Sequence, residues 1–223
     1  MTAPRSTRAV DRALSLLAAV CESGSMTLAE SARRAELPAS TALRLLRTLE
    51  TWDLVRRDGD GSFRAGTRLL QLGALALGDE SLAVRARPHL EQMVEQTGES
   101  AYVSVRGAGQ TVLYIGQVEG THAIRHISWV GKTVPLVGTA AGAALRGEVP
   151  AQGYVALRVT VEPDVTAIAA PVRGPVGTVV GALSLVGPTF RIDDDRLVRY
   201  GELLAEHARK LTAELGYRGG DDR

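Results

Sequence analysis

Residues 26–66 read MTLAESARRAELPASTALRLLRTLETWDLVRRDGDGSFRAG, and they decide the fold of the N-terminal part of the chain. Two short helical patterns, separated by a tight connector, are followed by a basic strand, a DGDG turn and a second short strand. That order predicts a winged helix-turn-helix. Thr27, with Glu30 three residues later, predicts a capping box at the start of the first of these helices. Pro38 suits the first turn of the second.

The second of these helices is predicted to have one apolar and one polar face. On a 3.6-residue period, the apolar stripe contains Ala42, Leu45, Leu46 and Leu49. The opposite side contains Ser40, Arg44, Arg47 and Thr51, with Thr41, Leu43 and Thr48 on the flanks. A helix that enters the major groove of DNA requires this division.

The side chains predicted to contact DNA are Ser40, Thr41, Leu43, Arg44, Arg47, Thr48, Arg57 and Arg64. Those in the first turns of the helix are placed for base edges, where Arg44 suits guanine and Leu43 suits a thymine methyl group. Arg47, further along, suits phosphate. The two arginines that flank the DGDG turn suit the neighbouring backbone or minor groove. A solvated surface is the alternative interpretation for all of them.

Composition supports a soluble two-part chain with a basic N-terminal part. The 223 residues are 45% hydrophobic and carry a net charge of +1. Residues 1–68 contain 11 arginines and 8 acidic residues, whereas the remainder contains 15 basic and 17 acidic residues. The basic excess therefore lies with the predicted DNA-binding head. No apolar run approaches bilayer length, so we expect a cytoplasmic protein without a membrane partner.

The sequence offers little for catalysis or metal binding. Cys21 is the one cysteine, which excludes an intrachain disulfide. It continues the apolar row Val10, Leu14 and Leu17 of a helix predicted over residues 8–22, so we expect a buried thiol. The four histidines show no metal spacing, and there is no Gly-rich phosphate loop or nucleophile elbow. We therefore expect no cofactor and no enzymatic activity. A small-molecule-converting enzyme with a protein-binding winged helix is a rival hypothesis.

The second half of the chain is predicted to be a mixture of strands and helices. Helical patterns over residues 69–94, interrupted near Gly78, form the expected linker. Strands are expected at 101–106, 111–118, 122–129, 165–172 and 176–186. Helices are expected at 139–145 and 193–215. Strands that pair in sequence order, with helices at the ends, predict an α+β fold. The predicted domains are 6–67 (winged helix), 68–97 (linker), 98–216 (second domain) and 217–223 (tail).

The chain resembles the IclR family of bacterial transcription regulators over nearly its whole length. The resemblance rests on LPASTALRLLRTLE and LVRRDGDGSFRAGTRLLQLG in the head, and on ARPHLEQMVEQTGESAYVSV, VGKTVPLVGTAAGAAL and IAAPVRGPVGTVVGALSLVGP in the second domain. It implies a winged helix joined by a linker helix to a GAF-like effector-binding domain. It also implies a homodimer or tetramer on palindromic operators, with repression as the commoner mode of action.

Small residues at the start of the 139–145 helix are expected to admit a ligand carboxylate to free backbone N–H groups. Close helix–sheet packing is the alternative explanation for them. With the resemblance, the predicted effector-binding residues are Val137, Gly138, Thr139, Ala140, Ala141, Leu157, Ala167 and Ser184. The effector is expected to be a carboxylic acid or an aromatic metabolite.

Two departures from the family bear on this pocket. Only residues 146–152 lie between Leu145 and Gly153, where relatives carry a longer helical sub-lobe over the pocket. Leu157 and Ala167 stand where the family often has an acidic residue and a cysteine. Of two family hydroxyls on the following strand, Ser184 remains. The alternative function is therefore a constitutive DNA-binding regulator whose second domain only dimerises.

Overall fold

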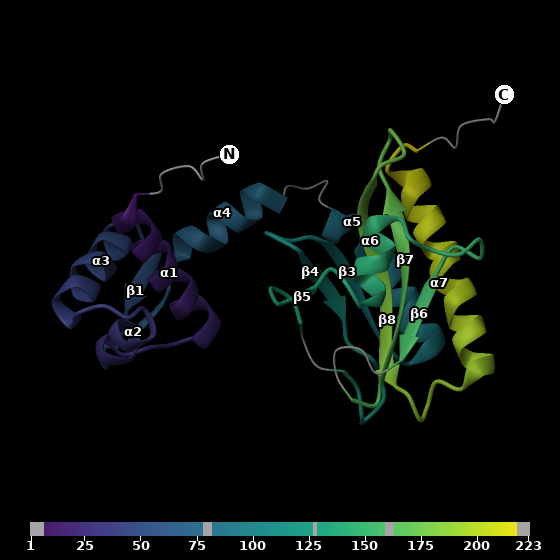
Figure 1. The fold of residues 1–223 in the computed structure, drawn as a ribbon, viewed down its shortest axis with the longest axis horizontal. Coiled ribbons are helices and arrows are strands. Elements are labelled where there is room, and N and C mark those ends of the chain that lie inside the picture. The colour runs from purple at the N-terminus through teal and green to yellow at the C-terminus, as the bar shows by residue number, and fades with distance from the viewer. Residues whose placement is uncertain (1–6, 78–81, 127–128, 159–162, 218–223) are drawn as a thin grey trace. The chain divides into compact units, whose positions relative to one another are not determined.

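A computed structural model describes residues 7–77, 82–126, 129–158 and 163–217. The chain divides into two compact units, Met1–Gly78 and Asp79–Arg223, and each is described by itself below (Figure 1). Among the described residues, no helix is both long and apolar enough to cross a bilayer.

The first unit is a helical head with a two-stranded wing. Its elements are α1 (Arg8–Ser23), α2 (Leu28–Arg34), α3 (Ala39–Thr51), β1 (Val55–Arg57), β2 (Phe63–Ala65) and α4 (Thr67–Leu77). The capping box of α2 is confirmed: the Thr27 hydroxyl accepts from the Glu30 N–H at 3.3 Å, and the Glu30 carboxylate accepts from the Thr27 N–H at 2.8 Å. The predicted helix-turn-helix and wing are both present.

The core of the head contains the predicted stripe of α3. Ala42, Leu45, Leu46 and Leu49 are all buried. β1 and β2 pair antiparallel, and Met26 adds a bridge to the wing by exchanging two backbone hydrogen bonds with Phe63, at 3.0 and 2.7 Å. Gly61 has a φ of 84° in the turn between the strands, a conformation that glycine adopts without strain.

The predicted inward face of α1 is wrong at Val10, Leu14 and Cys21, whereas Leu17 is half-buried and packs against the head's core. Val10 and Leu14 are 53% and 56% exposed, and Cys21 is also exposed. The buried residues are Leu16, Ala19 and Val20. Two rows of apolar residues on this helix both fit the helical period, so the period alone does not show which row is buried. The row that contains Ala19 is the one that packs into the head's core, leaving the thiol at the surface.

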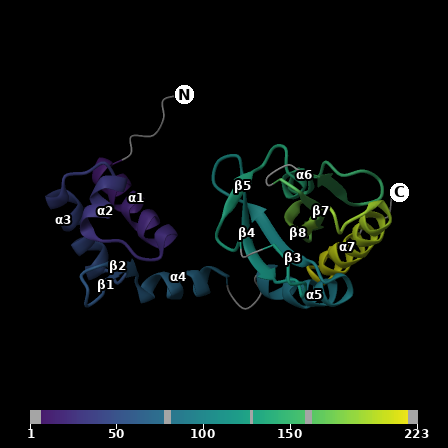
Figure 2. The ribbon, with the colours of Figure 1, turned by 90° about the horizontal axis from the view of Figure 1, so that it is seen from below.

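The second unit is a six-stranded antiparallel sheet with helices on both faces (Figure 2). Its elements are α5 (Leu82–Thr97), β3 (Ser100–Arg106), β4 (Thr111–Val118), β5 (Thr133–Pro135), α6 (Ala140–Arg146), β6 (Val155–Arg158), β7 (Val165–Arg173), β8 (Val179–Pro188) and α7 (Asp194–Glu214). The strand order is β5-β4-β3-β8-β7-β6. α5 and α7 pack on one face and α6 on the other. The α+β class is confirmed.

Most of the predicted elements of this unit are present, with one exception. The 122–129 strand is wrong, because the described residues 122–126 and 129 are not in a strand. Side-chain contacts hold this segment instead of a sheet ladder. The Ser100 hydroxyl donates to the His126 carbonyl at 3.0 Å, and the Arg191 guanidinium donates to the Ile124 carbonyl at 2.9 Å. The short strands β5 and β6 were not predicted.

Two buried histidines join α5 to α7. The Nδ1 atoms of His89 and His207 are 3.1 Å apart, and His89 Nε2 lies 3.3 Å from a Glu214 carboxylate oxygen. Burial, and then the neighbouring His89, lower the pKa of His207 below its ordinary 6.5. As the pH falls through 6.5, the unfolded chain therefore takes up a proton at His207 before the folded chain does.

The melting temperature of the protein is accordingly expected to fall between pH 7.5 and pH 5.5, since stability is lost as the pH drops through that window. Thermal unfolding followed by circular dichroism measures it. His207→Gln is expected to reduce this pH dependence, and Arg199→Gln, at an exposed position of the same helix, is the control that keeps it. An unchanged pH dependence in His207→Gln would count against this assignment.

Candidate nucleic-acid interface and effector pocket

The outer face of α3 presents hydroxyls and unpaired cations. Ser40, Arg44, Arg47 and Thr48 are exposed. Within the described part of the chain, neither arginine forms an ion pair. The Thr48 hydroxyl donates to the Arg44 carbonyl at 3.1 Å, which leaves its oxygen free to accept. The helix therefore offers two extended guanidinium groups to a partner without first breaking a salt bridge.

Two other side chains of α3 that were predicted to contact DNA are less exposed to solvent. Thr41 is half-buried, and Leu43 is half-buried because it packs against the head's core. Leu43 therefore contributes to holding α3 in place as well as presenting an edge to the outside.

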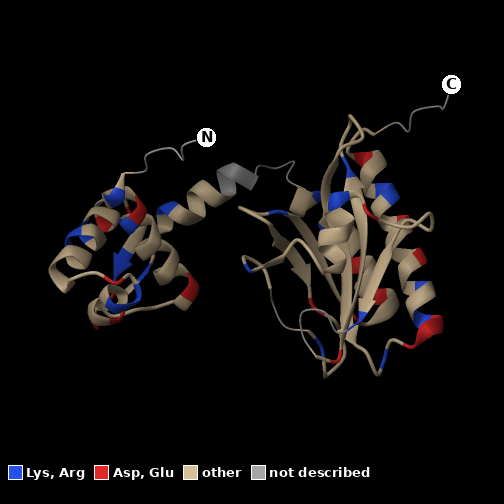
Figure 3. Ribbon diagram, viewed as in Figure 1, with Lys and Arg blue, Asp and Glu red and all other residues tan. Residues whose placement is uncertain are grey.

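The arginines of the wing interact with other side chains of the same hairpin. Arg64 Nε lies 2.7 Å from a carboxylate oxygen of Asp58, and Arg56, directly opposite Arg64 in the register, lies 3.6 Å from the other. The Arg57 guanidinium lies 5.8 Å from the centre of the Phe63 ring. Figure 3 shows basic residues on several elements of this unit, including the wing. Sequence reasoning missed Arg56, because only the strand register, which pairs it with Arg64, shows that the two residues share a face.

The face of the sheet covered by α6 is the candidate effector site. Thr139 caps α6, since its hydroxyl oxygen accepts from the Gly142 N–H at 3.1 Å and its hydroxyl donates to the Pro135 carbonyl at 2.8 Å. Ala140 and Ala141 are buried against the sheet. A Cβ at Gly142 would lie 1.9 Å from the Leu136 carbonyl oxygen, so close packing does require a glycine there.

The remaining predicted effector residues divide between the surface and this face. Val137 is 70% exposed, and Gly138 is exposed with a φ of 80°. Leu157 and Ala167 are register partners and are half-buried against the α6 cluster. Ser184 is 2% exposed. The structure therefore brings Thr139, Ala140, Ala141, Leu157, Ala167 and Ser184 to one face, while Val137 and Gly138 lie at the outside.

Four aromatic rings on this face form a connected cluster that sequence reasoning missed. Tyr102 contacts Tyr114 and His126 with ring centres 5.4 and 5.5 Å apart, and Trp129 contacts Tyr114 and His126 at 5.5 and 4.9 Å. The Tyr102 hydroxyl lies 2.5 Å from His126 Nδ1. Burial raises the pKa of Tyr114 to about 12, so its phenol stays neutral. Strand alternation predicts that Tyr114 and Val112 share one face of β4. No feature of the sequence predicts that Trp129 contacts Tyr114.

Two buried polar atoms beside the cluster have no hydrogen-bond partner among the described residues: the Gln117 amide nitrogen and the Ser184 hydroxyl. Gln117, Tyr102 and Ser184 are register partners on the adjacent strands β4, β3 and β8. With strands about 4.8 Å apart, the two unpartnered groups lie on backbones about 10 Å apart. Native proteins rarely leave such groups unpaired, so both atoms are available to hydrogen-bond a bound molecule.

In the described part of the chain, no group of three or more histidine, cysteine or acidic side chains is arranged to hold a metal ion. A basic recognition helix and wing in one unit, with an aromatic-lined sheet face in the other, define the class of protein: a DNA-binding regulator with a small-molecule domain.

Comparison with known proteins identifies the family. A model described as the IclR helix-turn-helix domain matches residues 9–59, and one described as the bacterial transcriptional regulator IclR C-terminal matches residues 74–151 and 147–213. The chain belongs to the IclR family of bacterial transcription regulators, whose members here are regulators and not enzymes.

Curated relatives and solved structures that are similar to this chain are also IclR-type regulators. The transcriptional repressor AllR of Klebsiella pneumoniae is 28% identical over 252 residues, covering 96% of this chain and 92% of AllR. The regulator BhcR of Paracoccus denitrificans is 28% identical, covering 92% and 86%. The IclR regulator of Alicyclobacillus acidocaldarius is 26% identical with a TM-score of 0.77, covering 95% of this chain and 100% of that one. An IclR homologue of Microbacterium hydrocarbonoxydans, complexed with 4-hydroxybenzoate, has a TM-score of 0.80 at 24% identity, covering 93% and 98%.

The comparisons also bear on the shortened segment: the match to AllR gives a difference in length, and the family model gives a position. The match to AllR spans 252 positions but uses 96% of 223 residues, so about 38 positions have no counterpart in this chain. The C-terminal family model likewise matches in two pieces that meet at residues 147–151. This is the connection between α6 and β6, where the sub-lobe was expected to be missing.

Proposed function

We propose that the protein is a cytoplasmic repressor that binds a palindromic operator as a homodimer or tetramer. The observation that carries this proposal is the outer face of α3, with Arg44 and Arg47 exposed and unpaired beside a hydroxyl-bearing first turn. Arg44 is assigned to a guanine edge and Arg47 to phosphate, with Arg57 and Arg64 of the wing on the adjacent backbone. Contact with DNA would require Arg64 to exchange its Asp58 partner for a phosphate.

The affinity for the operator is proposed to depend on a small aromatic acid bound at the α6 face. The four-ring cluster supplies apolar contact area, while the Gln117 amide nitrogen and the Ser184 hydroxyl, which have no partner among the described residues, supply hydrogen bonds. The homologue solved with 4-hydroxybenzoate supports this ligand class. Such a ligand shifts the equilibrium only by its differential affinity for two states of the protein, typically 1–3 kcal/mol.

The operator proposal is tested by fluorescence anisotropy with DNA from immediately upstream of the protein's own gene. Binding is expected to be much tighter than to a scrambled duplex of the same length. The logarithm of the binding constant is expected to fall linearly with the logarithm of salt concentration, with a slope of about −0.9 for each phosphate contacted. Equal affinity for the two duplexes would contradict a sequence-specific regulator.

The effector proposal is tested by thermal shift with aromatic acids, amino acids and oxoacids. A ligand at 100 times its dissociation constant adds about 2.7 kcal/mol of stability. Ser184→Ala is expected to leave the ligand-free melting temperature unchanged or higher, since the hydroxyl that it removes has no partner, and to reduce the shift caused by the aromatic acid.

Ser104→Ala is the matched control for that variant. Ser104 lies in β3, is fully buried, and donates to the Ala182 carbonyl at 3.5 Å. It is expected to keep the ligand-induced shift. The absence of a shift with every compound would instead favour a constitutive regulator, the alternative suggested by the shortened 146–152 segment.

A further inference from the structure

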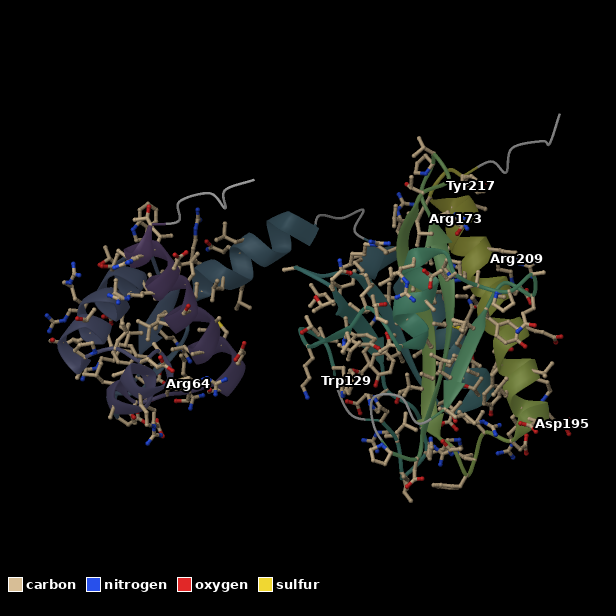
Figure 4. The ribbon with its side chains drawn as sticks, in the orientation of Figure 1. Arg64, Trp129, Arg173, Asp195, Arg209 and Tyr217 are labelled. Atoms are coloured by element: carbon tan, nitrogen blue, oxygen red, sulfur yellow. The ribbon has the colours of Figure 1, made fainter. Side chains whose placement is uncertain are left out.

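A hollow lies in the Asp79–Arg223 unit and shares no residue with the aromatic cluster. Its volume is about 480 Å³. It is lined by the 149–153 connection, by Pro171 and Arg173 of β7, by α7 and by Tyr217. Figure 4 shows Arg173, Arg209 and Tyr217 near the C-terminal end of α7, with Trp129 in another part of the unit.

The hollow exists because β7 extends further than its neighbour β6. β6 begins at Val155, which pairs with Ala169, so residues 170–173 of β7 have no strand on that side. The Arg173 N–H donates to the Thr212 hydroxyl of α7 at 2.9 Å in place of a strand partner. The short connection from α6 runs past this open edge. Alanines on the facing side of α7 (Ala205, Ala208 and Ala213) leave the space empty.

The lining itself carries positive charge, although Glu206, outside the lining, is close enough for its carboxylate to interact with Arg209. It contains two arginines and no acidic residue. The Arg173 guanidinium donates to the Gly177 carbonyl at 2.9 Å, and Arg209 Nε donates to the Ala205 carbonyl at 3.3 Å. Neither arginine forms an ion pair within the ranges that the structure describes. Since a guanidinium has five N–H donors, each retains several for a ligand. The Gln152 amide and the Tyr217 phenol add neutral polar groups at the rim.

We propose that this hollow is a second small-molecule site, which binds a metabolite through a carboxylate or phosphate group. Arg173 and Arg209 would hold the anionic group, because two guanidiniums with free donors match carboxylate and phosphate geometry. The alanine and proline surface would contact the aliphatic part of the ligand. The volume lies within the ordinary range for metabolite sites. This chemistry differs from that of the α6 face, where the available contacts are aromatic rings, an amide and a hydroxyl.

The test is isothermal titration calorimetry of the full-length protein at low ionic strength, with citrate and with inorganic phosphate as probes. At least one of these anions is expected to bind with one site per chain. Binding of citrate alone would indicate a carboxylate site, and binding of phosphate alone a phosphate site. The double substitution Arg173→Gln and Arg209→Gln is expected to weaken binding at least tenfold. Arg199→Gln, on the same helix but outside the lining, is expected to leave it unchanged.

A further variant separates this site from the basic head, which also attracts anions. Ala213 is exposed and lines the hollow, so Ala213→Glu introduces a carboxylate beside the arginines without disturbing the core. It is expected to abolish anion binding while the melting temperature stays within a few degrees of the wild type. The proposal is overturned if neither anion binds, or if binding survives both the arginine substitutions and Ala213→Glu. Because the ligand-induced thermal shift at the α6 face is measured separately, failure here leaves the effector proposal standing.

Discussion

Replacing Arg44 by alanine is expected to weaken binding to the upstream DNA by about 5- to 150-fold. A bidentate arginine–guanine pair contributes about 1–3 kcal/mol of discrimination, and each 1.4 kcal/mol is tenfold in affinity. Arg44 is exposed near the start of α3 and has no ion pair within the described residues, so its removal costs the head little stability. Fluorescence anisotropy on the upstream and scrambled duplexes measures both affinity and discrimination.

Arg47→Ala provides the contrast to this result. Because Arg47 is assigned to a phosphate, its replacement by alanine is expected to weaken binding to both duplexes equally and to reduce the salt slope by about one. Arg199→Ala, in the other unit, is the control that leaves both properties unchanged. If Arg44→Ala retained full preference for the upstream duplex, the assignment of α3 as the helix that contacts bases would be wrong.

Replacing Arg191 by alanine is expected to destabilise the second unit by about 3–5 kcal/mol. Its guanidinium forms two hydrogen bonds with the Glu99 carboxylate, at 2.5 and 2.9 Å, and Glu99 is completely buried. Removing Arg191 takes away the two hydrogen bonds of the buried Glu99 carboxylate, and His122 Nε2, 3.9 Å from it, does not replace them. For a unit of this size the melting temperature is expected to fall by about 10 °C, measurable by differential scanning calorimetry.

Arg125→Ala is the matched control for that experiment. Arg125 and Glu119 form an ion pair at 3.2 Å with both side chains about half exposed, so its loss is expected to cost less than about 1 kcal/mol. Adding Glu99→Gln to Arg191→Ala is expected to recover part of the lost stability, because it removes the unpaired charge. Equal shifts for Arg191→Ala and Arg125→Ala would contradict the account of a buried pair.

The Glu99–Arg191 pair also helps to position a residue of the candidate effector site. Arg191 donates to the Ile124 carbonyl as well as to Glu99, and the Ser100 hydroxyl, next to Glu99, donates to the His126 carbonyl. His126 is one of the four aromatic rings. The Glu99–Arg191 pair therefore holds the segment that brings His126 to the sheet, and Arg191→Ala is expected to weaken ligand binding as well as folding.

Local signals made the head largely predictable. The α3 stripe follows from a 3.6-residue period, and the capping box follows from two residues three apart. The α1 face failed because both of its apolar rows satisfy the same period, and the choice between them depends on packing with α3. Arg57 and Arg64 of the wing were predicted and Arg56 was missed, and the ion pairs of Arg56 and Arg64 with Asp58 depend on a turn geometry that the residue types alone do not specify.

In the second unit, sequence patterns predict the long elements but not the short strands or the aromatic cluster. Its long strands and α7 were predicted from alternation and periodicity, whereas β5 and β6, of three and four residues, are too short to give a pattern. The aromatic cluster joins Tyr102, Tyr114, His126 and Trp129 from separate segments. Their meeting depends on strand register and on a loop held by Glu99 and Arg191, which no local property of the sequence reveals.

The sheet order has a consequence for how the chain folds. β3 lies between β4 and β8, and Ser100 pairs with Val186, so the centre of the sheet closes only when segments more than eighty residues apart come together. The head is built from neighbouring elements instead. Non-local pairing slows folding, and chains fold from the N-terminus as they are synthesised. A nascent chain would therefore carry a folded DNA-binding head before the second unit has a central sheet.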